Sequence, residues 1–123
     1  MAKFNKIQQN KKALHRIDLL RQCQAKTKFI SFEPLLENIV DADLSGIDWA
    51  IVGGESGSGF RAMEMEWARS VRDACVKHNT AFFYKQDSGY KTELRPFLVE
   101  ADGSKWKWEQ MPKKLTAPQQ LYA

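Results

Sequence analysis

Hydrophobic residues recur with a helical period at two places in the chain. Ile17 and Leu20 belong to a series of apolar positions three or four residues apart, which predicts a basic helix over about residues 9–24. The same spacing predicts a second helix over about residues 64–78, with Asn79 as its stop signal. Each predicted helix has one apolar stripe and must therefore pack against another element.

Three short runs rich in aromatic and β-branched residues predict strands over residues 28–34, 48–52 and 80–84. The middle run is continuously apolar and stops at two glycines, as buried parallel strands do. A strand, a helix and a further strand in succession indicate a crossover connection and a parallel sheet. The pattern therefore predicts an α/β fold.

The last third of the chain has a different pattern. Residues 97–100 and 105–108 flank an Asp-Gly turn, which predicts a β-hairpin with Trp106 and Trp108 on one face. Packing on the domain is the simpler use of these two indoles, and base stacking is the alternative. The chain is expected to form a single domain over residues 1–123, made of a basic arm at 1–8, a strand–helix unit at 9–90, the hairpin within 91–112 and a tail at 113–123.

Polar residues follow each predicted strand of the sheet. Glu33, the Gly-Gly-Glu-Ser run at 53–56 and Lys85-Gln86 stand at the carboxyl ends, where parallel sheets collect ligands. Glu33 and Glu55 could face each other and bind an ammonium group, hold a metal or perform acid/base chemistry, or they could belong to structural salt bridges. With Lys85 and Arg61 nearby, the same set would suit a zwitterionic ligand.

The glycine-rich loop at 53–59 has two interpretations. Its backbone N–H groups could cradle an anion, or its glycines could serve only a turn with positive φ. It lacks the Gly-Lys-Ser/Thr of a P-loop, and a GxGxxA match at residues 57–62 begins four residues beyond the strand end, so a dinucleotide site is not expected.

Composition and charge narrow the function classes. The 123 residues are 43% hydrophobic and 28% charged, which suits one globular domain, and no apolar run approaches the length of a membrane span. Cys23 and Cys75 have no metal-ligand spacing, so no metal site is expected, and a buried Cys75 thiol fits a reducing cytoplasm. Residues 1–28 carry eight basic side chains against one carboxylate. This excess predicts either a solvated helix face or a nucleic-acid contact through Lys3, Lys6, Lys11 and Lys12.

Six stretches together resemble one protein family, the phage gene-product 37/68 family of unknown function. They are residues 16–22, 29–36, 47–57, 60–63, 66–67 and 81–86, in that order. The resemblance implies a half TIM-like barrel of parallel strands with crossover helices and a C-terminal hairpin, related to radical-SAM proteins. By position it implies a ligand site lined by Glu33, Gly53, Gly54, Glu55, Ser56, Arg61, Lys85 and Gln86.

The same resemblance bears on cofactors and partners. Full-length relatives are expected to carry SAM and an iron–sulfur cluster, with the cluster cysteines in an N-terminal half that this chain lacks. The chain alone is therefore expected to hold no cofactor and to be a non-catalytic binding module for a small anion, a protein or a nucleic acid. The alternative is one part of a split enzyme that needs a separate cluster-bearing chain. Open sheet edges would favour a homodimer or pairing with the missing half.

Overall fold

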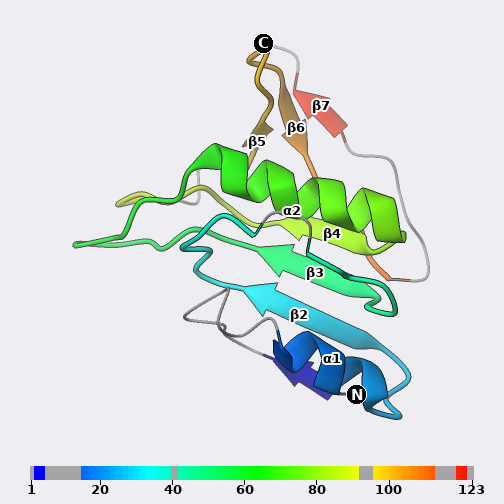
Figure 1. Cartoon of the computed structure of the whole chain (residues 1–123). Coiled ribbons are helices and arrows are strands. Elements are labelled where there is room, and N and C mark those ends of the chain that lie inside the picture. The colour runs from blue at the N-terminus through cyan, green and yellow to red at the C-terminus, as the bar shows by residue number, and fades with distance from the viewer. Residues whose placement is uncertain (1, 5–14, 40–41, 92–95, 113–118, 122–123) are drawn as a thin grey trace.

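A computed structural model of the chain describes residues 2–4, 15–39, 42–91, 96–112 and 119–121 (Figure 1). These residues form a mixed α/β fold with a parallel sheet and a small antiparallel sheet. The parallel sheet has the order β1-β2-β3-β4, and the antiparallel sheet has the order β5-β6-β7. The elements are β1 (Ala2–Phe4), α1 (His15–Gln22), β2 (Lys28–Phe32), β3 (Trp49–Val52), α2 (Met65–His78), β4 (Ala81–Tyr84), β5 (Leu98–Val99), β6 (Lys105–Lys107) and β7 (Gln119–Leu121).

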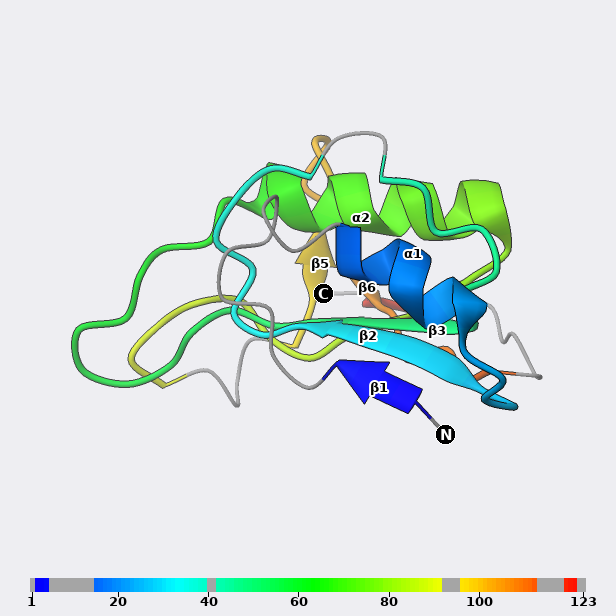
Figure 2. The same ribbon diagram turned by 60° about the horizontal axis from the view of Figure 1, so that its bottom comes forward.

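Both helices cover the same face of the parallel sheet (Figure 2). Because side chains alternate along a strand, every second residue of β2, β3 and β4 points toward the helices. The register aligns these residues in two rows across the sheet. The rows are Ile30, Ala50 and Phe82, followed by Phe32, Val52 and Tyr84, and all six residues are almost completely buried.

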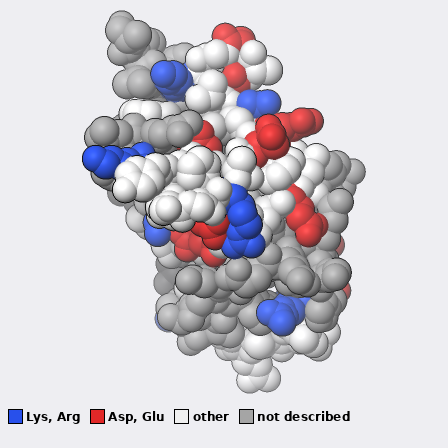
Figure 3. Space-filling view, turned by 90° about the vertical axis from the view of Figure 1, so that its left-hand side faces the viewer, with Lys and Arg blue, Asp and Glu red and all other residues white. Residues whose placement is uncertain are grey.

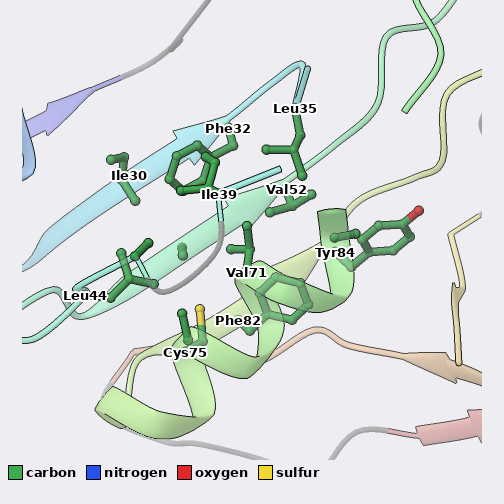
Figure 4. Close-up of a cluster of buried hydrophobic side chains, with 14 of the residues drawn as sticks. Ile30, Phe32, Leu35, Ile39, Leu44, Val52, Val71, Cys75, Phe82 and Tyr84 are labelled. Carbon is green, nitrogen blue, oxygen red and sulfur yellow. The ribbon is translucent and has the colours of Figure 1, made fainter. Parts of the chain in front are cut away.

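The described part of the connection from β2 to β3, residues 33–39 and 42–48, contains no helix, yet it fills the same layer. Leu35, Ile39 and Leu44 are fully buried and pack among the residues of the covered face (Figure 4). The Leu35 N–H donates a 3.0 Å hydrogen bond to the Gly53 carbonyl, which fixes the start of this connection against the end of β3. The covered face is therefore buried beneath α1, α2 and the segment that connects β2 to β3.

The outer edge of β4 is paired with the end of the hairpin. The Tyr84 N–H donates to the Trp108 carbonyl at 2.9 Å, and the Gln110 N–H donates to the Phe82 carbonyl at 3.0 Å. Phe83 and Glu109 form the antiparallel bridge between these bonds. This segment therefore occupies the position at which a fifth parallel strand would pair.

Two arginines join α2 to the antiparallel sheet. Arg72 makes a bidentate ion pair with Glu100, and its guanidinium lies 5.6 Å from the centre of the Trp108 ring. Arg69 donates a 2.6 Å hydrogen bond to the Val99 carbonyl. Trp106 and Trp108 pack against the core, so packing is the use that the structure shows for both indoles.

Several sequence predictions are confirmed at the level of the elements. The parallel strands, the second helix and the hairpin lie within one or two residues of their predicted bounds, and Asn79 ends α2 with a positive φ of 55°. The first helix ends at Gln22 rather than residue 24, while its predicted start lies outside the described residues. None of the helices in the described ranges is both long and apolar enough to span a membrane.

Two strands lie where the sequence predicted none. β1 forms within the predicted basic arm and pairs in parallel with β2, and β7 forms within the predicted tail and pairs with β6. Each has only three residues, too few to show an alternating pattern, and each is held by a partner strand distant in sequence. Among the residues that the structure describes, the parallel strands form an open sheet, so an α/β fold is shown and the predicted half barrel is not.

Candidate functional site

The polar residues predicted from the sequence gather at the carboxyl ends of β2, β3 and β4. Figure 3 looks onto this end of the sheet and shows basic and acidic side chains intermixed on it. Two ion pairs account for the four charged residues of the predicted site. Glu33 pairs with Lys85, and Glu55 pairs with Arg61.

Glu33 and Lys85 form an ion pair across the end of β3, the strand between β2 and β4. Lys85 Nζ lies 3.0 Å from Glu33 Oε1, and the buried Ser31 hydroxyl donates a 2.5 Å hydrogen bond to Glu33 Oε2. Gly53 follows β3 between the two residues, and a Cβ built there would lie 3.3 Å from Glu33 Oε1. The absence of a side chain at Gly53 therefore lets a residue after β2 reach a residue after β4.

The glycine-rich loop pairs with the segment that follows β4. Gly54 donates to the Gln86 carbonyl at 2.9 Å, Gly57 donates to the Gly89 carbonyl at 3.1 Å, and the Gln86 side chain donates to the Gly54 carbonyl at 2.9 Å. Ser56 forms a parallel bridge with Gly89. These loop amides therefore bind carbonyls of the chain itself, which is a different use from the anion cradle considered from the sequence.

Glu55 and Arg61 bind each other through several hydrogen bonds. Arg61 donates to both carboxylate oxygens of Glu55, at 3.0 Å from Nε and 2.6 Å from Nη2, and its backbone N–H donates at 2.8 Å. The side-chain hydrogen bonds from Arg61, followed by the backbone one, lower the pKa of Glu55 to about 2. Such a carboxylate is ionised at neutral pH and is a weak general base. Each glutamate therefore binds its own cation, and the two carboxylates do not form the pair considered from the sequence.

A groove adjoins the Glu33–Lys85 pair on the face of the sheet opposite α1 and α2. Its volume is about 240 Å³, and it is lined by Trp49, Ile51, Phe83, Lys85 and Met111. The Trp49 indole N–H donates a 3.0 Å hydrogen bond to the Gln110 carbonyl, and the Phe83 ring meets the indole edge-on at 6.3 Å. Sequence reasoning missed this groove, although the continuously apolar runs of β3 and β4 indicate that both faces of the sheet carry apolar residues.

A protein-family model matches the part of the chain that contains the site and the groove. The model of a family described as "Protein of unknown function (DUF5131)" matches residues 5–114. The chain belongs to this family. No curated protein and no solved structure matches the chain. Because the DUF5131 description assigns no activity, a function for this chain has to be argued from its geometry.

The cysteines and histidines of this DUF5131 chain do not gather into a ligand set. Cys75 lies on the buried face of α2, where desolvation raises the pKa of its thiol, whereas Cys23 is exposed after α1. His78 lies 3.8 Å from an Asp43 carboxylate oxygen. Within the described ranges, no three His, Cys, Asp or Glu side chains form a group that could hold a metal. The described residues therefore do not fit an iron–sulfur cluster, which is held by several cysteine thiolates.

The predicted nucleic-acid residues of this DUF5131 chain fall mostly outside the described residues. Lys3 belongs to β1, and Lys6, Lys11 and Lys12 lie in the segment that the structure does not describe. A nucleic-acid contact through these lysines stays a prediction.

Proposed function

We propose that this DUF5131 chain is a binding module that holds a small anion at the carboxyl edge of its parallel sheet, with Lys85 as the receiving cation, and that it catalyses no reaction alone. The observation that carries the proposal is the position of Lys85. Its side chain is 50% exposed, and it both pairs with Glu33 and lines the groove. Lys85 is thus a cation that a ligand can reach.

The contacts around Lys85 support a role in recognition more than a role in stability. An ion pair this exposed contributes only about 0–1 kcal/mol to folding. An ammonium group has three donors, and the bond to Glu33 uses one of them. Because Ser31 holds Glu33 in place, the carboxylate orients the lysine before a ligand arrives.

A thermal-shift screen with phosphate, nucleotides, methionine and SAM tests this proposal. We expect at least one of these anion-bearing ligands to raise the melting temperature of the wild type and of Lys77→Met, but not of Lys85→Met. Lys77 is a matched control, because it is an exposed lysine on α2, on the other side of the sheet. The proposal is wrong if no ligand shifts the wild type, or if Lys85→Met responds as strongly as the wild type does.

The barrel relationship is a second proposal, and the strand order supports it. Four parallel strands in sequential order, with both helices on one face, are what one arc of a β/α barrel would need, and we propose that this barrel is radical-SAM-like. The segment paired with β4 closes one edge, so further strands from a second copy or from a separate cluster-bearing chain would join beyond β1. In this proposal the chain is a phage or bacterial protein of the cytoplasm. A monomer by native mass spectrometry, alone and mixed with such a chain, would contradict the pairing.

A further inference from the structure

The groove beside Lys85 has an apolar lining, to which Lys85 contributes the aliphatic part of its side chain, while its ammonium group lies beside Glu33. Four of its five lining residues are Trp49, Ile51, Phe83 and Met111, and Lys85 is the only charged one. The volume of about 240 Å³ is below the range of about 300–1,000 Å³ that is common for ligand pockets. An occupant that complements these walls is therefore compact, mostly apolar and negatively charged at one point.

The spacing of residues along β4 sets the distance between the anionic group and the apolar group of the occupant. Phe83 and Lys85 are two residues apart on β4 and its extension, so their side chains leave the same face. Two residues of a strand span about 6–7 Å. The anionic group of the occupant should therefore lie about that far from the apolar group that covers Phe83.

The walls of the groove combine a fixed part with an adaptable part. The Trp49 indole is held by its hydrogen bond to the Gln110 carbonyl and by the rings of Phe29 and Phe83, at 5.6 and 6.3 Å. Met111 is 48% exposed, and its flexible thioether can move to cover an apolar guest. Burial of these exposed apolar surfaces would stabilise a bound apolar group.

We infer that the anion recognised at Lys85 is an organic acid with a compact apolar body, such as a single ring joined to a carboxylate by a short link, and that this body lies in the groove. The inference rests on the proposed function, because it takes Lys85 as the anion site. It adds the class of ligand. A cationic ligand would be repelled by the ammonium group of Lys85. A bare inorganic anion would leave the apolar walls of the groove exposed.

Calorimetric titration with matched probes tests the inference. 3-Phenylpropionate carries both the ring and the charge, acetate lacks the ring, and 3-phenylpropanamide lacks the charge. We expect 3-phenylpropionate to bind the wild type about tenfold or more tightly than either of the others, because its apolar surface is buried while its carboxylate reaches Lys85.

Two variants locate the contributions of the two parts. Met111→Ala should weaken 3-phenylpropionate binding several-fold and leave acetate unchanged, whereas Lys85→Met should abolish the preference for 3-phenylpropionate over its amide. Val76→Ala and Lys77→Met are controls for these two variants, because both residues are exposed on α2. Thermal unfolding of each variant checks that it folds.

The outcomes separate the inference from the proposed function. If acetate or phosphate binds in a Lys85-dependent way and 3-phenylpropionate binds no more tightly, the inference is wrong and the anion site stands. If 3-phenylpropionate binds Lys85→Met and the wild type equally, the anion role of Lys85 is wrong, and the inference fails with it. If none of the three probes binds the wild type, the inference is overturned, and the anion site is overturned with it only if phosphate, nucleotides, methionine and SAM also leave the melting temperature unchanged.

Discussion

The two faces of the parallel sheet both carry large apolar side chains, but they are covered to different extents. On the helix-covered face Ile30, Phe32 and Phe82 are completely buried. On the opposite face, Trp49 and Phe83 are only partly buried and border a groove. Parallel sheets usually have both faces covered. The helix-covered face therefore supplies most of the buried core, whereas Trp49 and Phe83 on the opposite face keep part of their apolar surface exposed, where we propose that a ligand binds.

The largest expected effect comes from truncating neighbouring residues of β4 that point to opposite faces. Phe82→Ala should lower the free energy of unfolding by about 3–5 kcal/mol, because it leaves a cavity among buried side chains. Phe83→Ala should cost about 1 kcal/mol, because Phe83 is already partly exposed. Urea denaturation measures both values.

For ligand binding, the order of the two positions should be the opposite of their order for stability. Phe83→Ala should weaken the binding of 3-phenylpropionate, and a folded variant at position 82, such as Phe82→Leu, should not. Equal costs of unfolding for the two alanine variants, or unchanged binding in Phe83→Ala, would contradict the division between the faces.

An intermediate effect is expected from the two glycines that follow β3. A Cβ at Gly54 would lie 2.3 Å from the Ser88 backbone nitrogen, so Gly54→Ala should separate the paired loops and cost about 1–3 kcal/mol in unfolding free energy. A Cβ at Gly53 meets mainly the ends of the Gln86 and Glu33 side chains, at 2.9 and 3.3 Å. These side chains can move, so Gly53→Ala should cost less.

The two glycine variants also distinguish stability from binding. Gly53→Ala should disturb the Glu33–Lys85 pair and weaken the binding of anions, while its chemical denaturation curve stays close to that of the wild type. A larger loss of stability for Gly53→Ala than for Gly54→Ala would show that the loops pair differently from the structure.

The strands β2, β3 and β4 could be predicted from the sequence because each is a run of apolar residues bounded by polar ones. The gathering of Glu33, residues 53–56 and residues 85–86 at one edge was also predictable, because they directly follow these strands, whereas ligand binding by these residues stays a prediction. The pairing of Glu33 with Lys85 was not, since it depends on the register and on the absence of a side chain at Gly53. The groove was missed because Met111, one of its walls, approaches β3 and β4 only through the pairing of the hairpin end with β4.

The smallest change in stability is expected from the Glu55–Arg61 pair, which lies in the loop after β3 and outside both faces of the sheet. The pKa of Glu55 is lowered from 4.5 to about 2 in the folded chain by the hydrogen bonds from Arg61. Its contribution to stability is therefore fully present above pH 4.5 and is lost as the pH falls toward 2, because the unfolded chain takes up the proton first.

Thermal unfolding across this pH window tests the contribution of Glu55. Between pH 5 and pH 2.5 the melting temperature of the wild type should fall slightly further than that of Glu55→Gln, which has no carboxylate to protonate. Parallel curves for the two proteins would show that the pair contributes nothing to stability.

The most direct test of a ligand site on the face opposite the helices is a titration of methyl-labelled methionines observed by NMR. Met111 lines the groove, whereas Met63 is buried in the core and Met65 packs against it. As 3-phenylpropionate is added, the Met111 methyl signal should move until the site is saturated, while the signals of Met63 and Met65 stay in place. Movement of the Met63 or Met65 signal with a stationary Met111 signal would contradict the account and place the ligand on the other side of the sheet.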